Sequence, residues 1–314
     1  MLKVLSLFSG IGGLCSPYKN VVMAVDNNPN TVETYRLNYP HINVVCDDIL
    51  TREKYPDHNF IVGGFNCQPY SISGLRKGFK DDRAKPLFKT IELIDNPNVE
   101  GFCLENVKNF LSHNKGETFK WLMLTLQNLG FHVTYLCCNS KNHGVPQNRE
   151  RVFILGFRDP LRWFTFNSQL PKQKMPPLSS CINFGEESED SKDYFTPQQF
   201  TKYYELYKKA INEYKGDYHN AIFQLGRLDV RTHKNGYAPC LTANMGGGGH
   251  NVPVIVTDAG NYRKLLPKET FNLQGFWGYK LPDIRKANLH QQAGNAVSFP
   301  LGKLLAKEVE KVFD

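Results

Sequence analysis

One cysteine of this chain stands in a setting that favours nucleophilic chemistry. Cys67 lies in a turn-like run that follows a short apolar stretch with the pattern of a buried strand: Gly63-Gly64-Phe65-Asn66-Cys67-Gln68-Pro69-Tyr70-Ser71. The glycines before it and the proline after it indicate an exposed turn, in which a thiol is accessible to a substrate. The alternative is that Cys67 is a small core residue, as most cysteines are.

The beginning of the chain carries a glycine-rich loop of the kind that binds a nucleotide-like cofactor. In Phe8-Ser9-Gly10-Ile11-Gly12-Gly13, small residues stand where a predicted strand ends, so backbone amides can approach a ligand closely. Asp26 ends the next predicted strand, where a carboxylate can accept hydrogen bonds from two ribose hydroxyls. Asp48-Ile49 follows a further short strand and suits an adenine amine. Together these features favour an adenosine-bearing cofactor over a structural turn.

The elements that must position these residues follow a regular rhythm. Apolar runs alternate with helix-like segments, which predicts an α/β sheet covered on both faces. The predicted strands are 4–8, 21–25, 60–62, 102–104, 133–137 and 152–157, and the predicted helices are 29–38, 87–94 and 118–129.

The character of the chain changes near Asp159. Several prolines, the acidic stretch 186–193 and an aromatic and lysine-rich segment follow, which indicates a second, smaller domain. From Leu265 the pattern is regular again, and 294–313 is predicted as one final helix that returns to the first domain. We therefore expect domains at 1–165, 166–282 and 283–314.

The composition sets limits on the class of protein. With 314 residues, 41% of them hydrophobic, the chain can form one large core or one core and a smaller domain. Lys and Arg exceed Asp and Glu by 38 to 30, a net charge of +8 that permits a polyanionic partner.

The eight cysteines show no CxxC pair, so we expect reduced thiols and no metal site. Nothing approaches the roughly 18 apolar residues of a membrane span, so we expect no membrane partner. A lipoprotein-type signal over 1–15 is disfavoured, because serines and glycines interrupt its apolar run.

The segment around Cys67 resembles the nucleophile motif of the cytosine-5 DNA methyltransferases, and the other motifs of that family stand in order along the chain. They are the cofactor loop at Phe8 to Gly13, the glutamate motif Leu104-Glu105-Asn106-Val107, the paired arginines in Gln147-Asn148-Arg149-Glu150-Arg151, Arg263-Lys264-Leu265 with Glu269 and Leu273-Gln274-Gly275-Phe276, and Gly294-Asn295-Ala296-Val297. The resemblance implies a doubly wound, mostly parallel, Rossmann-like sheet with a smaller target-recognition domain.

The resemblance also implies a reaction. A methyl group of S-adenosylmethionine passes to C5 of a cytosine in a specific double-stranded DNA sequence, after Cys67 has added to C6, because C5 alone is a poor nucleophile. The base must first leave the duplex. Glu105, as a shielded acid, fits protonation of N3, with a helix-start carboxylate as the alternative. Arg151 would donate to O2 and Arg149 would brace the cysteine loop, unless both merely solvate a strand edge.

Further binding residues follow from the same resemblance. Those expected to bind S-adenosylmethionine are Phe8, Gly10, Ile11, Gly13, Asp26, Asn27, Asp48, Ile49, Leu87, Asn295 and Ala296. Those expected to contact DNA are Ser71, Arg76 and Arg83, in and beside a basic loop that can cover phosphates, and Thr242, Gly246 and Gly247, at the close of the target-recognition domain. The basic loop has a plain alternative as a solvated surface loop.

The chain departs from the family pattern in two places. Asn66 stands where family members carry a proline, which weakens the case for full activity. The stretch from Gly13 to Asp26 is short and contains Pro17, which predicts a turn in place of the first helix and weaker cofactor binding.

Three other functions stay open at this stage: cytosine methylation of tRNA, a catalytically silent DNA-binding protein, and a nicotinamide oxidoreductase. We expect a monomer in the cytoplasm of a bacterial or phage-infected cell, with a separate restriction endonuclease as a conceivable companion.

Overall fold

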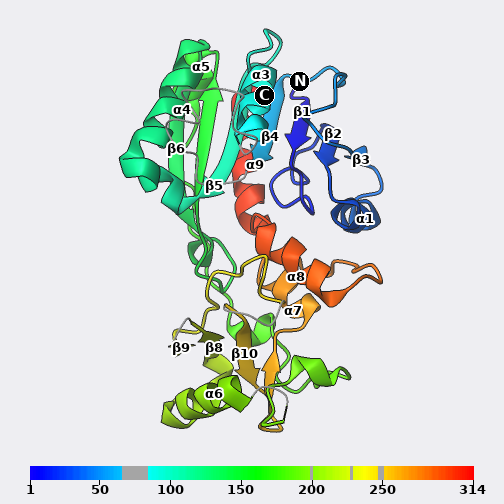
Figure 1. Cartoon of the computed structure of the whole chain (residues 1–314). Coiled ribbons are helices and arrows are strands. Elements are labelled where there is room, and N and C mark those ends of the chain that lie inside the picture. The colour runs from blue at the N-terminus through cyan, green and yellow to red at the C-terminus, as the bar shows by residue number, and fades with distance from the viewer. Residues whose placement is uncertain (66–83, 199–200, 227–228, 247–250) are drawn as a thin grey trace. The chain divides into compact units, whose positions relative to one another are not determined.

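A computed structural model describes residues 1–65, 84–198, 201–226, 229–246 and 251–314 of the chain (Figure 1). Its contacts define two compact units, each with its own sheet. The first unit comprises Met1–Cys138, Glu150–Pro171 and Leu301–Asp314, and the second comprises Asn139–Arg149 and Lys172–Pro300. The functional domains predicted at 1–165, 166–282 and 283–314 are divided at other residues, and their roles stay a prediction.

A seven-stranded sheet with the order β3-β2-β1-β4-β5-β7-β6 forms the first unit. The strands are β1 Val4–Leu7, β2 Val21–Asp26, β3 Val44–Cys46, β4 Phe60–Gly64, β5 Gly101–Val107, β6 His132–Asn139 and β7 Glu150–Phe157. β1, β2, β3, β4 and β5 pair in parallel with their neighbours, whereas β7 runs antiparallel to β5. The predicted α/β class with a mostly parallel sheet is therefore confirmed, and each predicted strand is present.

Helix α1 of the first unit begins where the sequence supplies a side-chain cap. Asn28 caps α1 by accepting hydrogen bonds from the backbone of Asn30 and Thr31, and Pro29 suits the first turn. The stretch between β1 and β2 forms turns, as Pro17 predicted. The helical elements are α1 Pro29–Asn38, α3 Lys85–Ile94, η2 Lys108–Gly116, α4 Glu117–Asn128, α5 Pro160–Thr165 and α9 Phe299–Phe313, whose first two residues belong to the second unit.

Alternating side chains give the large sheet two buried faces. On one face, Ile61 and Phe102 form a core with Leu87 of α3 and Leu122 of α4. On the other, Phe60 and Phe157 meet Phe313 of α9, with ring centroids 5.6 and 6.3 Å apart. Strands buried on both faces are typical of parallel sheets, and this explains why their sequences are continuous apolar runs.

The second unit is built on a four-stranded antiparallel sheet with the order β11-β10-β8-β9. Its core packs Tyr207 against Phe223 and Val254. The strands are β8 Ile222–Leu225, β9 Val230–His233, β10 Pro253–Val256 and β11 Tyr262–Lys264. The helical elements are η3 Ser140–Asn142, η4 Leu178–Ser180, η5 Ser191–Asp193, α6 Thr201–Glu213, η6 Tyr218–Asn220, α7 Pro267–Asn272 and α8 Lys286–Asn295.

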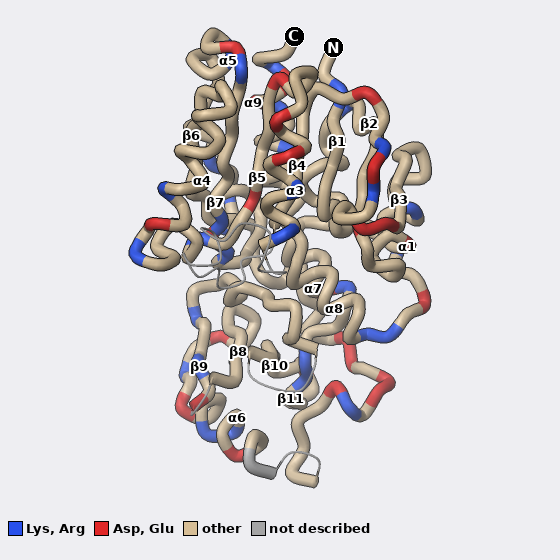
Figure 2. The backbone as a smooth tube through the Cα atoms, turned by 45° about the horizontal axis from the view of Figure 1, so that its top comes forward, with Lys and Arg blue, Asp and Glu red and all other residues tan. Residues whose placement is uncertain are grey.

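The single final helix predicted over 294–313 is wrong in its extent. α8 ends at Asn295, Ala296 is extended (φ −66°, ψ 148°), and α9 begins only at Phe299. The described helices include none that is long and apolar enough to cross a membrane. Figure 2 shows Lys and Arg in both units, interspersed with Asp and Glu.

Candidate active site

The cofactor residues predicted in the first unit gather at one edge of its sheet. β3, β2 and β1 are parallel neighbours, and their registers pair Leu7 with Val25 and Asp26 with Cys46. Their carboxyl ends therefore lie side by side, at the point where the strand order turns from β1 to β4. Open α/β sheets bind ligands at such a switch point.

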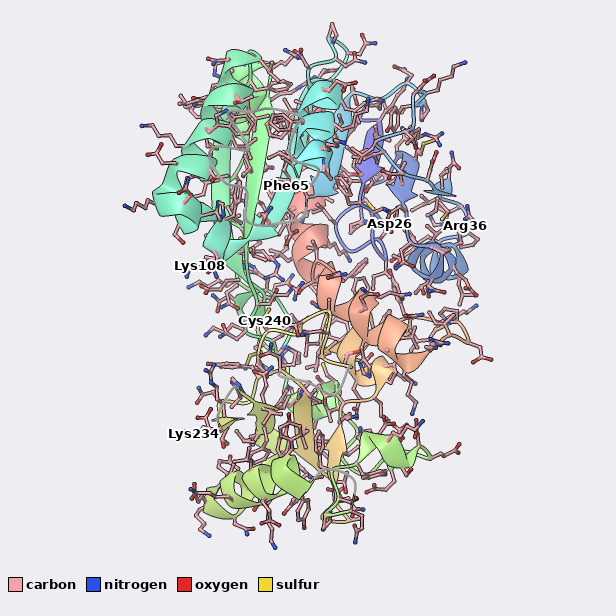
Figure 3. The ribbon with its side chains drawn as sticks, in the orientation of Figure 1. Asp26, Arg36, Phe65, Lys108, Lys234 and Cys240 are labelled. Carbon is pink, nitrogen blue, oxygen red and sulfur yellow. The ribbon has the colours of Figure 1, made fainter. Side chains whose placement is uncertain are left out.

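Asp26 fixes the loop that follows β1. Its carboxylate accepts hydrogen bonds from the backbone N–H of Gly10 at 2.9 Å and of Asn28 at 3.0 Å (Asp26 is labelled in Figure 3). Burial raises the pKa of Asp26, and these two hydrogen bonds act in the opposite direction. Phe8 and Gly10 adopt positive φ angles of 51° and 54°, so the chain turns sharply here.

Two features of this loop suit a bound polar ligand. The hydroxyl of Ser9 is buried and has no hydrogen-bond partner among the described residues. Beside it, a Cβ added to Gly10 would meet nothing within 4 Å, so there is open space against the backbone. An adenosine-bearing cofactor would fit both observations, because it brings polar groups close to glycine backbone.

The other predicted cofactor residues differ in exposure. Ile11, Ile49 and Leu87 are buried, with Ile49 and Leu87 in the core cluster, whereas Asn27 is exposed. The Asp48 carboxylate accepts a hydrogen bond from the backbone of Leu50 at 2.9 Å. Gly13 lies beneath α9. Asn295, which is exposed, and Ala296 belong to the second unit. Their contacts with a cofactor stay a prediction.

Glu105 and Arg151 form an ion pair across two strands of the first unit. Arg151 Nε lies 2.9 Å from Glu105 Oε1, and the two side chains are only 11% and 14% exposed. The register explains the contact: Glu105 pairs with Phe153 and Val107 with Arg151, so the two charged residues are diagonal neighbours on one face. A Cβ at Gly64 would lie 2.8 Å from Glu105 Oε2, so this glycine makes room for the carboxylate.

Asn106 holds the end of the strand that precedes the predicted nucleophile. Its buried Nδ2 donates to the carbonyl of Phe65 at 3.0 Å, and the Phe65 ring packs edge-on against Phe110 at 5.4 Å. Figure 3 labels Phe65 just past β4. Cys67 follows two residues later. The sequence motifs alone assign no role to Asn106. Several of the predicted catalytic and DNA-binding residues lie outside the described residues: Cys67, Ser71, Arg76, Arg83 and Gly247.

Arg149 is a buried clamp within the second unit. Only 1% of the residue is exposed, and its guanidinium donates to the carbonyls of Leu241 at 2.9 Å, Gly294 at 2.8 Å and Ala296 at 2.7 Å. Gln147 works beside it, since Nε2 donates to Leu273 O at 2.9 Å and Oε1 accepts from Leu241 N at 3.1 Å. The alternative of two solvated arginines is therefore wrong. The brace that Arg149 was predicted to provide for the cysteine loop stays a prediction.

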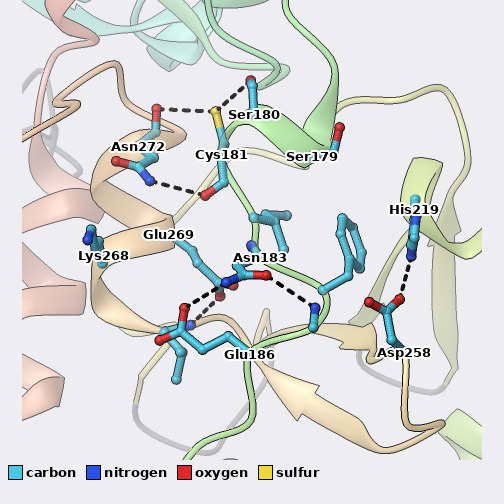
Figure 4. A pocket seen from close by; sticks show the side chains of 14 residues that line it. Ser179, Ser180, Cys181, Asn183, Glu186, His219, Asp258, Lys268, Glu269 and Asn272 are labelled. Carbon is cyan, nitrogen blue, oxygen red and sulfur yellow. Dashed lines mark hydrogen bonds and ion pairs between the residues drawn. The ribbon is translucent and has the colours of Figure 1, made fainter.

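A separate cavity of about 380 Å³ lies within the second unit (Figure 4). His219 and Asp258 form a 2.8 Å pair at its edge, and Glu269 and Asn183 contact one another on its wall. None of the described site residues predicted from the sequence lines it. In the described part of the chain, no group of three or more His, Cys, Asp and Glu is placed to hold a metal ion.

Comparison with known proteins gives one consistent result. The family model of the C-5 cytosine-specific DNA methylases matches residues 2–311. The Type II methyltransferase M.Bsp6I of Bacillus sp. (strain RFL6) is 36% identical over 321 residues, covering 99% of each chain. M.SsoII of Shigella sonnei is 30% identical, covering 99% of this chain and 81% of its own length. A crystal structure of a Spodoptera frugiperda DNMT2 mutant has a similar fold, with a TM-score of 0.74 at 21% identity over 99% of this chain and 100% of that one.

Proposed function

The chain belongs to the C-5 cytosine-specific DNA methylase family, and from this premise we propose that it methylates C5 of a flipped-out cytosine within a specific double-stranded DNA sequence. S-adenosylmethionine is the proposed methyl donor. The observation that carries the proposal is the largely shielded Glu105–Arg151 pair beside Asn106, whose amide donates to Phe65 O two residues before Cys67. A family match over residues 2–311 supports the same assignment.

S-adenosylmethionine supplies a sulfonium methyl group when it is bound. In this proposal the loop Phe8 to Gly13 carries its backbone amides toward the cofactor, and Asp26 accepts hydrogen bonds from the ribose hydroxyls. Asp48 serves the adenine amine. The buried Ser9 hydroxyl and the open space beside Gly10 support this placement. The hydrogen bonds from Gly10 and Asn28 fix the Asp26 carboxylate before a ligand arrives, which reduces the entropy lost on binding.

Cys67 begins the chemistry as a thiolate. Its sulfur forms a bond to C6 of the cytosine, and the electron pair of the C5–C6 double bond moves onto the ring. Glu105 relieves this charge by donating a proton to N3, and Arg151 holds the carboxyl through Oε1 while donating to O2. Because Oε1 contacts the arginine, Oε2 is the oxygen that carries the proton for N3 in this proposal. C5 then takes the sulfonium methyl group, and the electron pair of the broken S–CH3 bond stays on the departing thioether sulfur. Water accepts the C5 proton, Glu105 takes back the proton from N3, and the electrons of the C5–H bond re-form the C5–C6 double bond and expel Cys67 as a thiolate.

A fluorine at C5 tests the covalent step, because elimination would require it to leave as F⁺ in place of the proton, so the adduct is trapped. Duplex oligonucleotides containing 5-fluorocytosine in the target sequence are incubated with the protein and S-adenosylmethionine, then run on a denaturing gel. We expect a shifted covalent band for the wild type and none for Cys67→Ser. If the wild type binds the duplex tightly and no band forms, the mechanism is wrong. Parallel methyl-transfer assays on duplex DNA and tRNA separate the two substrate classes.

We further propose that the second unit reads the DNA sequence, with Thr242, Gly246 and Gly247 at the contact, and that Ser71, Arg76 and Arg83 lie against phosphates. In this proposal catalysis and cofactor binding belong to the predicted domain 1–165 and its C-terminal part 283–314, and target recognition belongs to 166–282. Because the related M.Bsp6I and M.SsoII are Type II methyltransferases, a cognate restriction endonuclease acting separately is the proposed companion. The monomeric state and a cytoplasmic location belong to the same proposal.

A further inference from the structure

The segment Leu241 to Gly246, called here the Thr242 turn, is anchored at two points and exposed between them. Leu241 and Met245 are 1% and 2% exposed, whereas Asn244 is exposed. Met245 N donates to Thr242 O at 3.2 Å, and Thr242 Oγ1 donates to Asn244 Oδ1 at 2.8 Å. The turn therefore presents polar side chains on a fixed backbone.

Helix α8 forms the floor of the Thr242 turn. His290 and Gly294 are four residues apart, so they lie on one face of the helix. A Cβ on Gly294 would overlap the Thr242 carbonyl group, which means that the two backbones touch there. A Cβ on Gly246 would lie 2.9 Å from His290 Cδ2 and 3.1 Å from His290 Cβ. The two ends of the turn thus rest on residues one helical turn apart.

The two ends are held in different ways. Arg149 and Gln147 bind the backbone of Leu241 with hydrogen bonds, whereas Gly246 rests on the flat His290 ring. His290 is 6% exposed, and burial lowers its pKa to about 4, so the ring is neutral near pH 7. Its Nδ1 has no hydrogen-bond partner in the described part of the chain. The contact is therefore one of shape rather than of charge.

We propose that His290 is a positioning residue for DNA binding. Its ring fixes the position of the Gly246 backbone above α8, and thereby the conformation in which the Thr242 turn meets the duplex. The inference rests on the proposed function, in which Thr242 and Gly246 contact DNA. His290 itself need not touch the DNA. Its role is to remove backbone freedom at a glycine, which would otherwise lose more entropy on binding than any other residue.

A double-mutant cycle tests this contact. Gly246→Ala places a methyl group against the ring, and His290→Ala removes the ring and leaves Gly246 unsupported. We expect each single variant to weaken binding of the target duplex by about tenfold, equivalent to about 1.4 kcal/mol. The double variant should recover most of this loss, because the new methyl group occupies the space that the ring vacated. His290→Phe, which keeps a ring, should bind the duplex like the wild type.

Duplex affinity is measured by fluorescence anisotropy, cofactor affinity by calorimetry, and folding by thermal unfolding. The proposal requires that Gly246→Ala and His290→Ala each raise the Kd and KM for DNA and leave the affinity for S-adenosylmethionine unchanged. The control Gln291→Ala, an exposed change on α8, should match the wild type. Additive losses in the double variant, or weakened binding by His290→Phe, would overturn it even when the wild type methylates DNA. A wild type that neither binds nor methylates duplex DNA would instead refute the proposed function. If His290→Ala fails to fold, Gly246→Ala and His290→Phe still give opposite expected results.

Discussion

Glu105 and Arg151 are 46 positions apart in the sequence and meet because β7 runs antiparallel to β5. That direction places Arg151 diagonally across from Glu105, and Gly64 on the parallel neighbour β4 leaves space for the carboxylate. An arginine that holds one carboxylate oxygen leaves the other free to face a base. In the proposed mechanism, this geometry lets an acid and an arginine from different strands contact the same ring.

A substitution can separate the proton-donating role of Glu105 from the contribution of its size and hydrogen bonding. Glu105→Gln keeps the size of the side chain and an oxygen for Arg151, but it cannot transfer a proton to N3. We expect the single-turnover methylation rate to fall by about 10² to 10⁴-fold, the usual contribution of a general acid. The Kd for target duplex should change by less than about threefold, because ground-state contacts are kept.

The matched control is Glu150→Gln, because Glu150 is 43% exposed and pairs with Lys108 at 2.8 Å away from the buried pair. Its methylation rate should equal that of the wild type. A Glu105→Gln enzyme that methylates at the wild-type rate would remove the proton donor from the mechanism.

Motif order indicated Glu105 and Arg151 from the sequence, but the partners of their neighbours were not predictable. Asn106 donates to Phe65, 41 positions away, and Gln147 donates to Leu273, 126 positions away. Such pairs depend on strand order and on how distant segments pack, which local patterns do not contain. The only local signal is an amide side chain close to a predicted site residue, Asn106 next to Glu105 and Gln147 two positions before Arg149, and that signal is weak.

Among the elements, α9 lies against the loop Phe8 to Gly13, which is proposed to bind the cofactor. A Cβ at Gly302 would overlap the carbonyl oxygen of Gly13, so the helix backbone lies directly against the loop. The close approach explains a glycine in the first turn of the helix, although glycine has a lower helix propensity than alanine. α9 thus helps to set the position of the loop that follows β1.

Gly302→Ala should therefore push the loop and α9 apart. Inserting a methyl group into a packed contact costs about 1 to 3 kcal/mol, so we expect a lower Tm despite the better helix propensity of alanine. We also expect the Kd for S-adenosylmethionine to rise by at least about fivefold, equivalent to about 1 kcal/mol, measured by calorimetry.

Lys303→Ala, on the exposed side of the same helix, serves as the control and should leave both values unchanged. A Gly302→Ala protein with wild-type Tm and cofactor affinity would show that α9 does not constrain the loop.

Element boundaries were predictable where a local signal exists. The bounds of α1 follow from Asn28 and Pro29, and the missing helix before β2 follows from Pro17. The break between α8 and α9 has a local signal that the predicted single helix over 294–313 overlooks: Pro300 fits the first turn of a new helix and cannot continue an existing one. A tertiary contact accompanies this signal, because Arg149 donates hydrogen bonds to the carbonyls of Gly294 and Ala296, at the end of α8 and just beyond it.

At the scale of the molecule, the two units are assembled from non-contiguous parts of the chain. Composition indicated a change near Asp159, close to the passage from the first unit to the second at 171–172. It did not indicate that 139–149 belongs to the second unit, because that membership depends on the buried hydrogen bonds of Gln147 and Arg149. Two cores of different size also imply that stability need not be lost in one step.

The second unit should respond to acid through His290. Burial lowers the pKa of His290 from 6.5 to about 4, so the unfolded chain binds a proton in a pH range where the folded chain does not. The free energy of unfolding therefore decreases as the pH falls from about 6.5 to about 4. We expect the contribution of His290 to this decrease to be about 2 kcal/mol between pH 7 and pH 5. His290→Phe cannot titrate, so its free energy of unfolding should fall less over the same interval, by about that amount. Burial also lowers the pKa of His233, but that contribution is common to both proteins and cancels in the difference.

Urea unfolding followed by circular dichroism at pH 7, 6 and 5 measures the effect, with Gln291→Ala expected to keep the wild-type dependence. Parallel curves for the wild type and His290→Phe would mean that the ring is already open to protonation, and that Gly246 does not rest on a permanently buried support.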